Sequence, residues 1–362
     1  MYFFGENGYL NLLKEALDNG EIKATRNGNV ISIFGCMTNF KNISLSFPLI
    51  TTKRMFFRGI VEELLWFLRG STNANELKQK NIHIWDGNSS RQYLDSIGLN
   101  YPEGELGPVY GWQWRKFGKA YETERYTVGS NSDEDIYNDI TDTSDSSDSS
   151  DSLINYIYPE ASNRSNRSNR SNSDGADPNG ADQIKYVIEE LSKDNNSRRA
   201  VLSGWNPTDL KKMALPPCHI LYIFNRSSKG LSCHMTLRSS DLFLGLPFNI
   251  ASTALLTQIL AHILHIPASE ISLSICDAHI YEEHIPQVNK QIARGEGSGS
   301  SGSSDPNGSS DIYDFPKVII KKAAPLAKAS IEDKLKWIEC LVYEDFELSN
   351  YKCGAPLSAI MK

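Results

Sequence analysis

The chain has 362 residues, of which 40% are hydrophobic and 22% are charged. This composition excludes collagen-like, coiled-coil and wholly disordered proteins, and the length suits one large domain or two ordinary ones. The formal net charge is −7, but residues 131–182 hold 12 acidic and 3 basic side chains. Leaving out that −9, and the −2 of Glu296 and Asp305 within residues 295–310, the rest of the chain carries +4. A mild positive charge favours a small anionic ligand over a DNA duplex.

The elements predicted from hydrophobic periodicity mix helices and strands. In chain order they are a helix at 9–19, strands at 30–34 and 45–47, helices at 57–68 and 184–191, strands at 199–205, 219–225 and 231–237, a helix at 249–265, and strands at 271–276 and 318–321. Because the helices and strands do not alternate strictly, the sequence predicts an α+β fold with a mixed twisted β-sheet and packed helices, in preference to a doubly wound fold.

Two segments differ sharply from the rest. Residues 131–182 contain Asp-Ser-Ser and Ser-Asn-Arg repeats, and residues 295–311 are rich in Gly and Ser. Neither can bury enough apolar surface to offset the entropy of ordering. The first is therefore predicted to be a disordered insertion and the second a flexible one, both inside a single domain covering residues 1–362. A recognition role for the repeats is the alternative.

The sequence also predicts a compartment and the absence of a metal. Six cysteines occur without a C-x-x-C pair, and no Cys and His spacing matches a zinc site. Reduced thiols and the lack of a signal peptide favour a soluble cytoplasmic protein without bound metal. The longest apolar run, residues 250–266, is interrupted by Gln258, His262 and His265, which favours a core helix over a membrane span.

Cys218 is a candidate nucleophile. It follows two prolines and precedes His219 at the start of a predicted strand. The ordinary interpretation of such a cysteine is a small buried hydrophobic residue. The two neighbours do not readily form a Cys–His dyad, because adjacent strand residues point to opposite faces. A nearby arginine would instead lower the pKa of the thiol and raise its thiolate fraction.

Arginines and hydroxyls stand at the ends of predicted strands. Arg198 and Arg199 precede one strand, and Arg238 and Ser239 follow another. They are either solvated strand ends or charge-assisted hydrogen-bond donors for a phosphate dianion.

Four further polar residues are candidates for a functional role. The Asn249 amide offers a donor and an acceptor that match a pyrimidine edge, although a helix cap is the alternative. His279 and Tyr281 share one face of an extended chain and could reach a sugar hydroxyl, although core packing is equally open. Glu63 lies in the middle of a helix that is apolar around most of its circumference, and a buried carboxylate needs a reason.

Read together and in order, these stretches resemble the thymidylate synthases. The motifs are SIFG at 32–35, FPLITTKR at 47–54, EELLWFLRG at 62–70, IWDGN at 84–88, GPVYGWQW at 107–114, residues 194–199, WNP at 205–207, residues 213–219 ending in PPCH, residues 238–250 and DAHIY at 277–281. The resemblance covers nearly all of the chain outside the two low-complexity segments.

The resemblance implies reductive methylation of dUMP to dTMP, with 5,10-methylenetetrahydrofolate as cosubstrate and dihydrofolate as by-product. Cys218 would attack C6 of the uracil, and Glu63 would organise water and proton transfers. The implied catalytic residues are Cys218, Glu63, His219, Tyr110, Asn249 and Arg238. The implied dUMP-binding residues are Arg26, Arg198, Arg199, Arg238, Ser239, Asp241, Asn249, His279 and Tyr281. The implied folate-binding residues are Lys53, Ile84, Trp85, Asn88, Asp241, Leu244, Gly245 and Phe248.

The family also implies a homodimer in which Arg198 and Arg199 reach across to the partner's site, with no membrane or DNA partner. Two departures concern the nucleotide site: Leu237 replaces the usual Gln beside Arg238, and the loop at Arg26 is one residue short. No stretch like a dihydrofolate reductase precedes the motifs, so the expectation is a monofunctional enzyme.

Two alternatives remain. One is a catalytically silent homologue that binds a nucleotide or RNA. The other is a deoxycytidylate hydroxymethylase, which shares the scaffold but carries Asp where Asn249 stands. An amide complements uracil, whereas a carboxyl group suits the amino edge of cytosine, so Asn249 favours dUMP.

Overall fold

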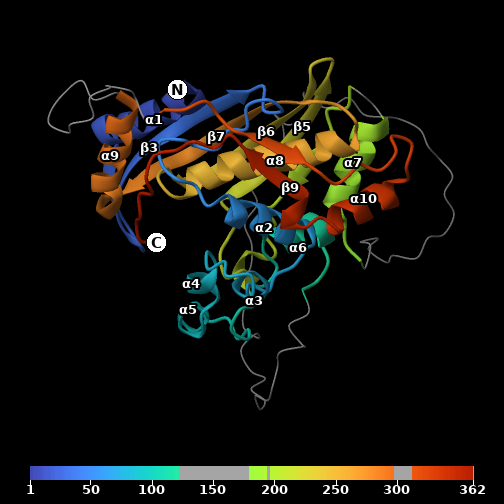
Figure 1. The fold of residues 1–362 in the computed structure, drawn as a ribbon. Helices are drawn as coiled ribbons and strands as arrows, with labels where there is room; N and C mark the ends of the chain where they lie inside the picture. The colour runs from blue at the N-terminus through green and yellow to red at the C-terminus, as the bar shows by residue number, and fades with distance from the viewer. Residues whose placement is uncertain (122–178, 194–195, 297–311, 362) are drawn as a thin grey trace, which may run out of the picture.

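The computed structural model describes residues 1–121, 179–193, 196–296 and 312–361 (Figure 1). At its centre is a seven-stranded sheet in the order β1-β3-β7-β6-β5-β4, with β2 paired to β3. Its strands are β1 (Tyr2–Phe4), β2 (Glu21–Thr25), β3 (Gly28–Lys41), β4 (Val201–Ser203), β5 (His219–Ser227), β6 (Gly230–Asp241) and β7 (Ala268–Tyr281). A separate two-stranded sheet joins β8 (Lys317–Ile320) to β9 (Phe346–Ser349).

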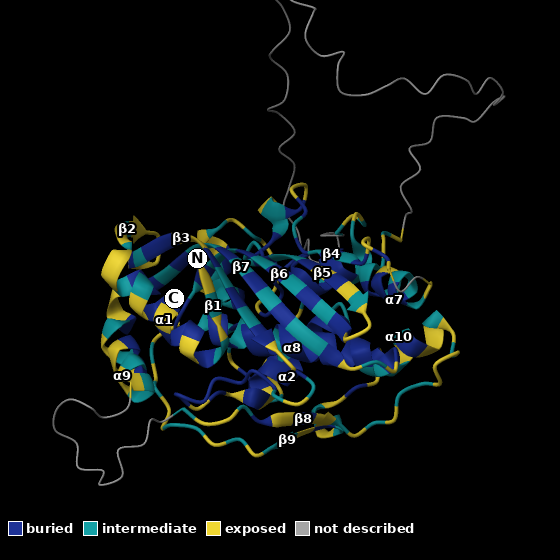
Figure 2. Cartoon of the chain, turned by 90° about the horizontal axis from the view of Figure 1, so that it is seen from above, coloured by how far each residue is buried: buried dark blue, intermediate teal, exposed yellow. Residues whose placement is uncertain are grey.

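The sheet is mixed, as predicted. The β1–β3 and β6–β7 pairs are parallel, whereas β2–β3, β3–β7, β5–β6 and β4–β5 are antiparallel. Along β6 and β7, buried residues alternate with half-exposed ones, so one face of the sheet is covered and the other is open within the described chain (Figure 2). This alternation is what a sheet with a single packed face requires.

Helices supply the covering layer. They are α1 (Gly5–Asn19), α2 (Phe57–Leu68), α3 (Asn75–Lys78), α4 (Asp86–Ser89), α5 (Arg91–Ser96), α6 (Tyr110–Lys116), α7 (Gln183–Lys193), α8 (Gly245–Ile263), α9 (Ile285–Glu296) and α10 (Ile331–Glu339). The long helix α8 lies against β6 and β7, and α2 packs on α8 and α6 (Figure 1). Within the described residues α8 is long and apolar enough to span a membrane, but 78% of its apolar window is buried in the protein. It is the core helix that the sequence predicts.

Some predicted boundaries were wrong. Residues 45–47 form no strand, because the chain turns there: the Leu45 N–H donates to the Asn42 carbonyl at 2.9 Å, and Asn42 has a positive φ of 56°. Helix α8 begins at Gly245 instead of 249, which places Pro247 in its first turn, where a missing N–H is tolerated.

The two predicted insertions fall mainly outside the described residues. The last residues of the first segment, 179–182, belong to the fold. Ala181 exchanges backbone hydrogen bonds with Phe117, and Asp182 accepts a hydrogen bond from Arg115 at 2.9 Å. The first two residues of the second segment complete α9.

Candidate active site

Strand pairing brings the candidate residues to one end of the sheet. Cys218 immediately precedes β5, and β5 runs antiparallel to β6, so that Cys218 lies beside Arg238 near the end of β6. Strand β7 runs parallel to β6, which puts His279 and Tyr281 at the same edge. Three strands thus place a thiol, a guanidinium group and a His–Tyr pair together.

The backbone at Cys218 is held on both sides. Its N–H donates to the Tyr110 hydroxyl oxygen at 2.8 Å, and its carbonyl accepts the Arg238 backbone N–H at 2.9 Å. The Arg238 guanidinium donates from Nε to the Pro217 carbonyl and from Nη2 to the Pro216 carbonyl, both at 2.9 Å. The two prolines and the arginine therefore fix the thiol's position.

The electrostatics of the thiol differ from expectation. Burial raises the pKa of Cys218, and the smaller effect of Arg238 lowers it only in part. Arg238 acts on the thiol in the predicted direction, but desolvation outweighs one guanidinium group, so the net pKa shift is upward. Burial therefore favours the protonated thiol in the folded chain.

His219 is a neutral, packed ring. It stacks on Tyr110 with centroids 4.1 Å apart and an interplanar angle of 25°. Burial lowers the pKa of His219 to about 3. Its Nδ1 lies 2.9 Å from the hydroxyl of Tyr222, a residue that the sequence analysis missed.

Glu63 lies in the middle of α2, where the sequence predicts a carboxylate in an otherwise apolar helix. Its Oε1 accepts a hydrogen bond from the Trp85 indole N–H at 2.8 Å. Burial raises the pKa of Glu63 to about 7, although the Trp85 bond favours the ionised form. A carboxyl group that titrates near neutral pH is suited to both donating and accepting protons.

The His–Tyr pair lies on one face of β7, as the i, i+2 spacing predicts. Nδ1 of His279 lies 2.8 Å from an Asp277 carboxylate oxygen and 3.5 Å from the Ser239 hydroxyl. The Tyr281 ring meets the imidazole edge-on at 5.3 Å. Asp277 thus orients a histidine that the sequence identified without its partner.

Asn249 is the fifth residue of α8 and caps nothing, because the N-cap position belongs to Leu244. It is partly exposed, and its side-chain amide makes no hydrogen bond to any residue that the structure describes. Gly245 and Phe248 lie on the same first turns of α8. Asp241 precedes the helix and accepts the Phe243 N–H at 2.8 Å. The start of α8 thus presents an unused amide beside apolar surface.

Residues 7–362 match the family model described as thymidylate synthase. The chain belongs to the thymidylate synthase family. Thymidylate synthase 1/2 of Encephalitozoon cuniculi is 36% identical over 347 residues, which cover 96% of this chain and 93% of that protein. The bifunctional dihydrofolate reductase-thymidylate synthase 1 of Arabidopsis thaliana is 38% identical over 345 residues, covering 95% of this chain and 52% of that protein. The Paramecium tetraurelia bifunctional protein is 39% identical over 348 residues, with coverages of 96% and 59%. The chain spans about half the length of the bifunctional relatives it matches.

The other residues that the resemblance assigns to the folate differ in how deeply they are buried. Ile84 and Asn88 are half-buried around Trp85. Lys53 is only 4% exposed. Its ammonium group bonds to the Phe243 carbonyl and lies 3.8 Å from the centroid of the Phe243 ring. Burial lowers the pKa of Lys53 to about 7.

The remaining arginines do not reach Cys218 within one chain. Arg26 is exposed in the turn between β2 and β3 and bonds only weakly, at 3.4 Å, to Asn27. Arg198 and Arg199 are exposed just before β4, where the Ala200 carbonyl accepts the Phe224 N–H, at the other end of β5 from Cys218.

Leu237, which stands where the resemblance implies a glutamine, is fully buried. A second missed residue, His284, follows β7. Its Nε2 lies 2.8 Å from the Ile360 carbonyl near the C-terminus, and its Nδ1 lies 3.7 Å from the Asp241 carboxylate. Burial lowers the pKa of His284, but Asp241 and Ile360 raise it by more, so the net shift is upward.

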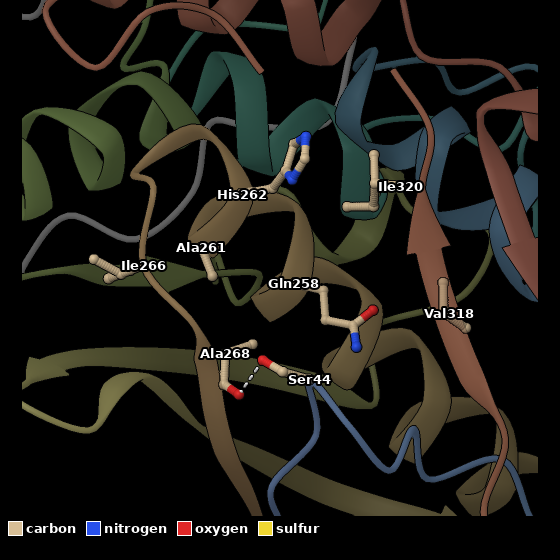
Figure 3. A pocket seen from close by; sticks show the side chains of 8 residues that line it. All are labelled: Ser44, Gln258, Ala261, His262, Ile266, Ala268, Val318 and Ile320. Carbon is tan, nitrogen blue, oxygen red and sulfur yellow. Dashed lines mark hydrogen bonds between the residues drawn. The ribbon is translucent and has the colours of Figure 1, made fainter. Parts of the chain in front are cut away.

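A cavity of about 150 Å³ lies away from the thiol, between α8 and β8 (Figure 3). The side chains that line it are Ser44, Gln258, Ala261, His262, Ile266, Ala268, Val318 and Ile320. Gln258 is nine residues beyond Asn249 on α8, which separates the two by about 13 Å along the helix. The cavity is lined by neither a thiol nor a carboxylate, so it is distinct from the sheet edge that holds Cys218. Across the described ranges, no three His, Cys, Asp or Glu side chains are grouped to hold a metal ion.

Proposed function

We propose that this chain catalyses the reductive methylation of dUMP to dTMP with 5,10-methylenetetrahydrofolate. The observation that supports it most is that one chain has both Cys218, with its backbone held in place, and Glu63, a carboxyl group that titrates near neutral pH. Cys218 has its backbone held by Tyr110 and Arg238, and burial raises the pKa of Glu63 to about 7. Nucleophilic attack and repeated proton transfer are the two demands of this reaction.

In the proposed mechanism Cys218 Sγ adds to C6 of the uracil, and the thiol proton passes to water as the bond forms. The added charge spreads to C5 and O4, where Glu63 would move protons through water. His219 and Tyr110 complete the polar network. The folate supplies the one-carbon unit and the hydride.

The ligand groups at the sheet edge support dUMP as substrate. Arg238 and Ser239 would hold the phosphate with charge-assisted bonds, together with Arg26. His279 and Tyr281 would bind the ribose hydroxyl. Asn249 has an unused amide, and its paired donor and acceptor match uracil N3–H and O4.

The residues present fit a folate. Ile84, Leu244 and Phe248 are partly buried apolar side chains packed at the edge of the core, and Trp85 adds an aromatic face. With Gly245 they would line a flat ring system. Asp241 would contact the pterin, while Asn88 and Lys53 would lie toward the rest of the molecule.

A homodimer is part of the proposal, with Arg198 and Arg199 binding phosphate in the partner's site. Their place at the far end of β5 supports this, as does exposed apolar surface on the sheet, where Phe34 is 77% exposed. Mixing inactive Cys218→Ala and Arg199→Ala chains should restore about a quarter of the activity, since half the dimers then hold one intact site. No recovery from a mixture shown to exchange subunits would contradict shared sites.

The direct test incubates the protein with dUMP and methylenetetrahydrofolate and follows dihydrofolate absorbance. The wild type should turn over dUMP, and Cys218→Ala should not. Cys340→Ala should keep the activity, because Cys340 is an exposed thiol at the end of α10. Nucleotide binding without turnover would favour a silent homologue. Faster turnover of dCMP than of dUMP would indicate a deoxycytidylate hydroxymethylase.

A further inference from the structure

Tyr222 lies outside every motif considered above, yet it contacts the site. It stands three residues after His219 on β5, a spacing that places two side chains on opposite faces of a regular strand. The register of β5 against β6 shifts between His219 and Leu221, as in a β-bulge. The bulge adds one residue and turns Tyr222 to the same side as His219.

The contact is short and enclosed. The Tyr222 hydroxyl lies 2.9 Å from Nδ1 of His219, and Tyr222 is 3% exposed. Burial raises the pKa of Tyr222 well above its usual value, so the phenol keeps its proton. The indole of Trp114 packs edge-on against the phenol ring at 5.6 Å and prevents it from swinging away.

Proton counting links the direction of this bond to the tautomer of His219. A neutral imidazole carries one hydrogen, and the phenol has one hydrogen to give. If the phenol donates to Nδ1, the imidazole hydrogen must lie on Nε2.

From His219 the effect reaches the nucleophile in two steps. The imidazole stacks face to face on Tyr110 at 4.1 Å. The Tyr110 hydroxyl oxygen then accepts the Cys218 backbone N–H at 2.8 Å. If the His219 ring rotated or changed tautomer, it would therefore disturb the Tyr110 phenol that holds the Cys218 backbone.

We propose that Tyr222 is a positioning residue of this active site, which holds His219 as the Nε2–H tautomer and in the ring plane on which Tyr110 stacks. The Nε2–H is left to donate to substrate or to ordered water, since among described residues the histidine's hydrogen bond is the one at Nδ1. The catalytic consequence rests on the proposed function, whereas the tautomer does not.

The first test reads the tautomer. Solid-state ¹⁵N NMR of the full chain with labelled histidine separates protonated from unprotonated ring nitrogens, and His219→Gln identifies the signals. The expected result is Nδ1 unprotonated and Nε2 protonated in the wild type, and a tautomer mixture in Tyr222→Phe. Hydrogen on Nδ1 in the wild type, or an unchanged spectrum in the variant, overturns the proposal.

The second test reads catalysis against a matched control. Tyr101 is also 3% exposed, and its hydroxyl donates to the Lys212 carbonyl at 3.0 Å, outside the site. Tyr222→Phe should lower kcat by about 10- to 100-fold with the KM for dUMP nearly unchanged, because a misplaced group acts on the transition state. Tyr101→Phe loses an equivalent bond and should keep kcat. Equal losses in both variants refute positioning. If the wild type does not turn over dUMP, the proposed function fails, and the tautomer measurement alone decides the role of Tyr222.

Discussion

Replacing Glu63 by Gln tests whether this carboxyl group is held protonated near neutral pH. The pKa of Glu63 is about 7 in the fold against an ordinary 4.5. Between these values the unfolded chain has released a proton that the folded chain keeps, so stability falls as pH rises. The difference corresponds to ~3 kcal/mol once both states are ionised. Glu63→Gln has no such proton to lose. Its free energy of unfolding relative to the wild type should therefore be ~3 kcal/mol higher above pH 7 than at pH 4.5.

The assay is denaturant unfolding of both proteins from pH 4.5 to pH 8 at one fixed protein concentration, since dimerisation would add a concentration term. Subtracting the two curves removes every other titrating group. A companion variant, Trp85→Phe, lacks the indole N–H that bonds to Glu63 Oε1 at 2.8 Å. Without that bond the ionised form of Glu63 is less favoured, so its pKa should rise further. The stability of Trp85→Phe should start to fall at the same pH as that of the wild type, and the fall should continue to a higher pH. A difference between wild type and Glu63→Gln that stays constant across the range would refute the reasoning.

Three further variants address the nucleophile, the base and the C-terminus. Cys218→Ala should abolish turnover and leave dUMP affinity within about tenfold, because the phosphate and base contacts remain; equilibrium dialysis measures the affinity, and a larger loss would mean that the thiol anchors the nucleotide. Asn249→Asp should shift the ratio of kcat/KM from dUMP toward dCMP by roughly 100-fold or more, since a carboxyl group suits the cytosine edge; an unchanged ratio would remove Asn249 from base selection. The pKa of His284 is raised, so the protonated imidazole stabilises the contact with Ile360. This stabilisation is complete below pH 6.5 and is lost as the pH rises through the raised pKa. Hydrogen exchange of residues 354–361, corrected for intrinsic rates, should accelerate over that rise in the wild type and not in His284→Gln; parallel profiles would contradict it.

Most of the architecture follows from local patterns. The apolar circumference of residues 57–68 predicts a buried helix and makes Glu63 conspicuous, and α2 has the predicted bounds. The β-type runs after Cys218 and before Arg238 predict strand ends, and antiparallel pairing brings the two ends together. The candidate site was therefore accessible from the sequence wherever a chemical residue stands at the end of a periodic segment.

The misses have physical causes that a one-dimensional pattern does not carry. A bulge changes which residues share a face, so Tyr222 gave no signal. The pKa of Cys218 depends on how much protein surrounds the thiol, and burial outweighs the Arg238 charge that the sequence displays. No local pattern shows that the ammonium group of Lys53, which the resemblance assigns to the folate site, bonds to the Phe243 carbonyl. Each error came from packing between segments distant in sequence.

The central claim is a covalent bond between one sulfur and the pyrimidine ring, and trapping measures it directly. The protein is incubated with 5-fluoro-dUMP and methylenetetrahydrofolate, digested, and analysed by mass spectrometry. The account predicts that the peptide containing Cys218 carries both the nucleotide and the folate. An adduct on any other side chain, or none in a sample that turns over dUMP, would contradict it.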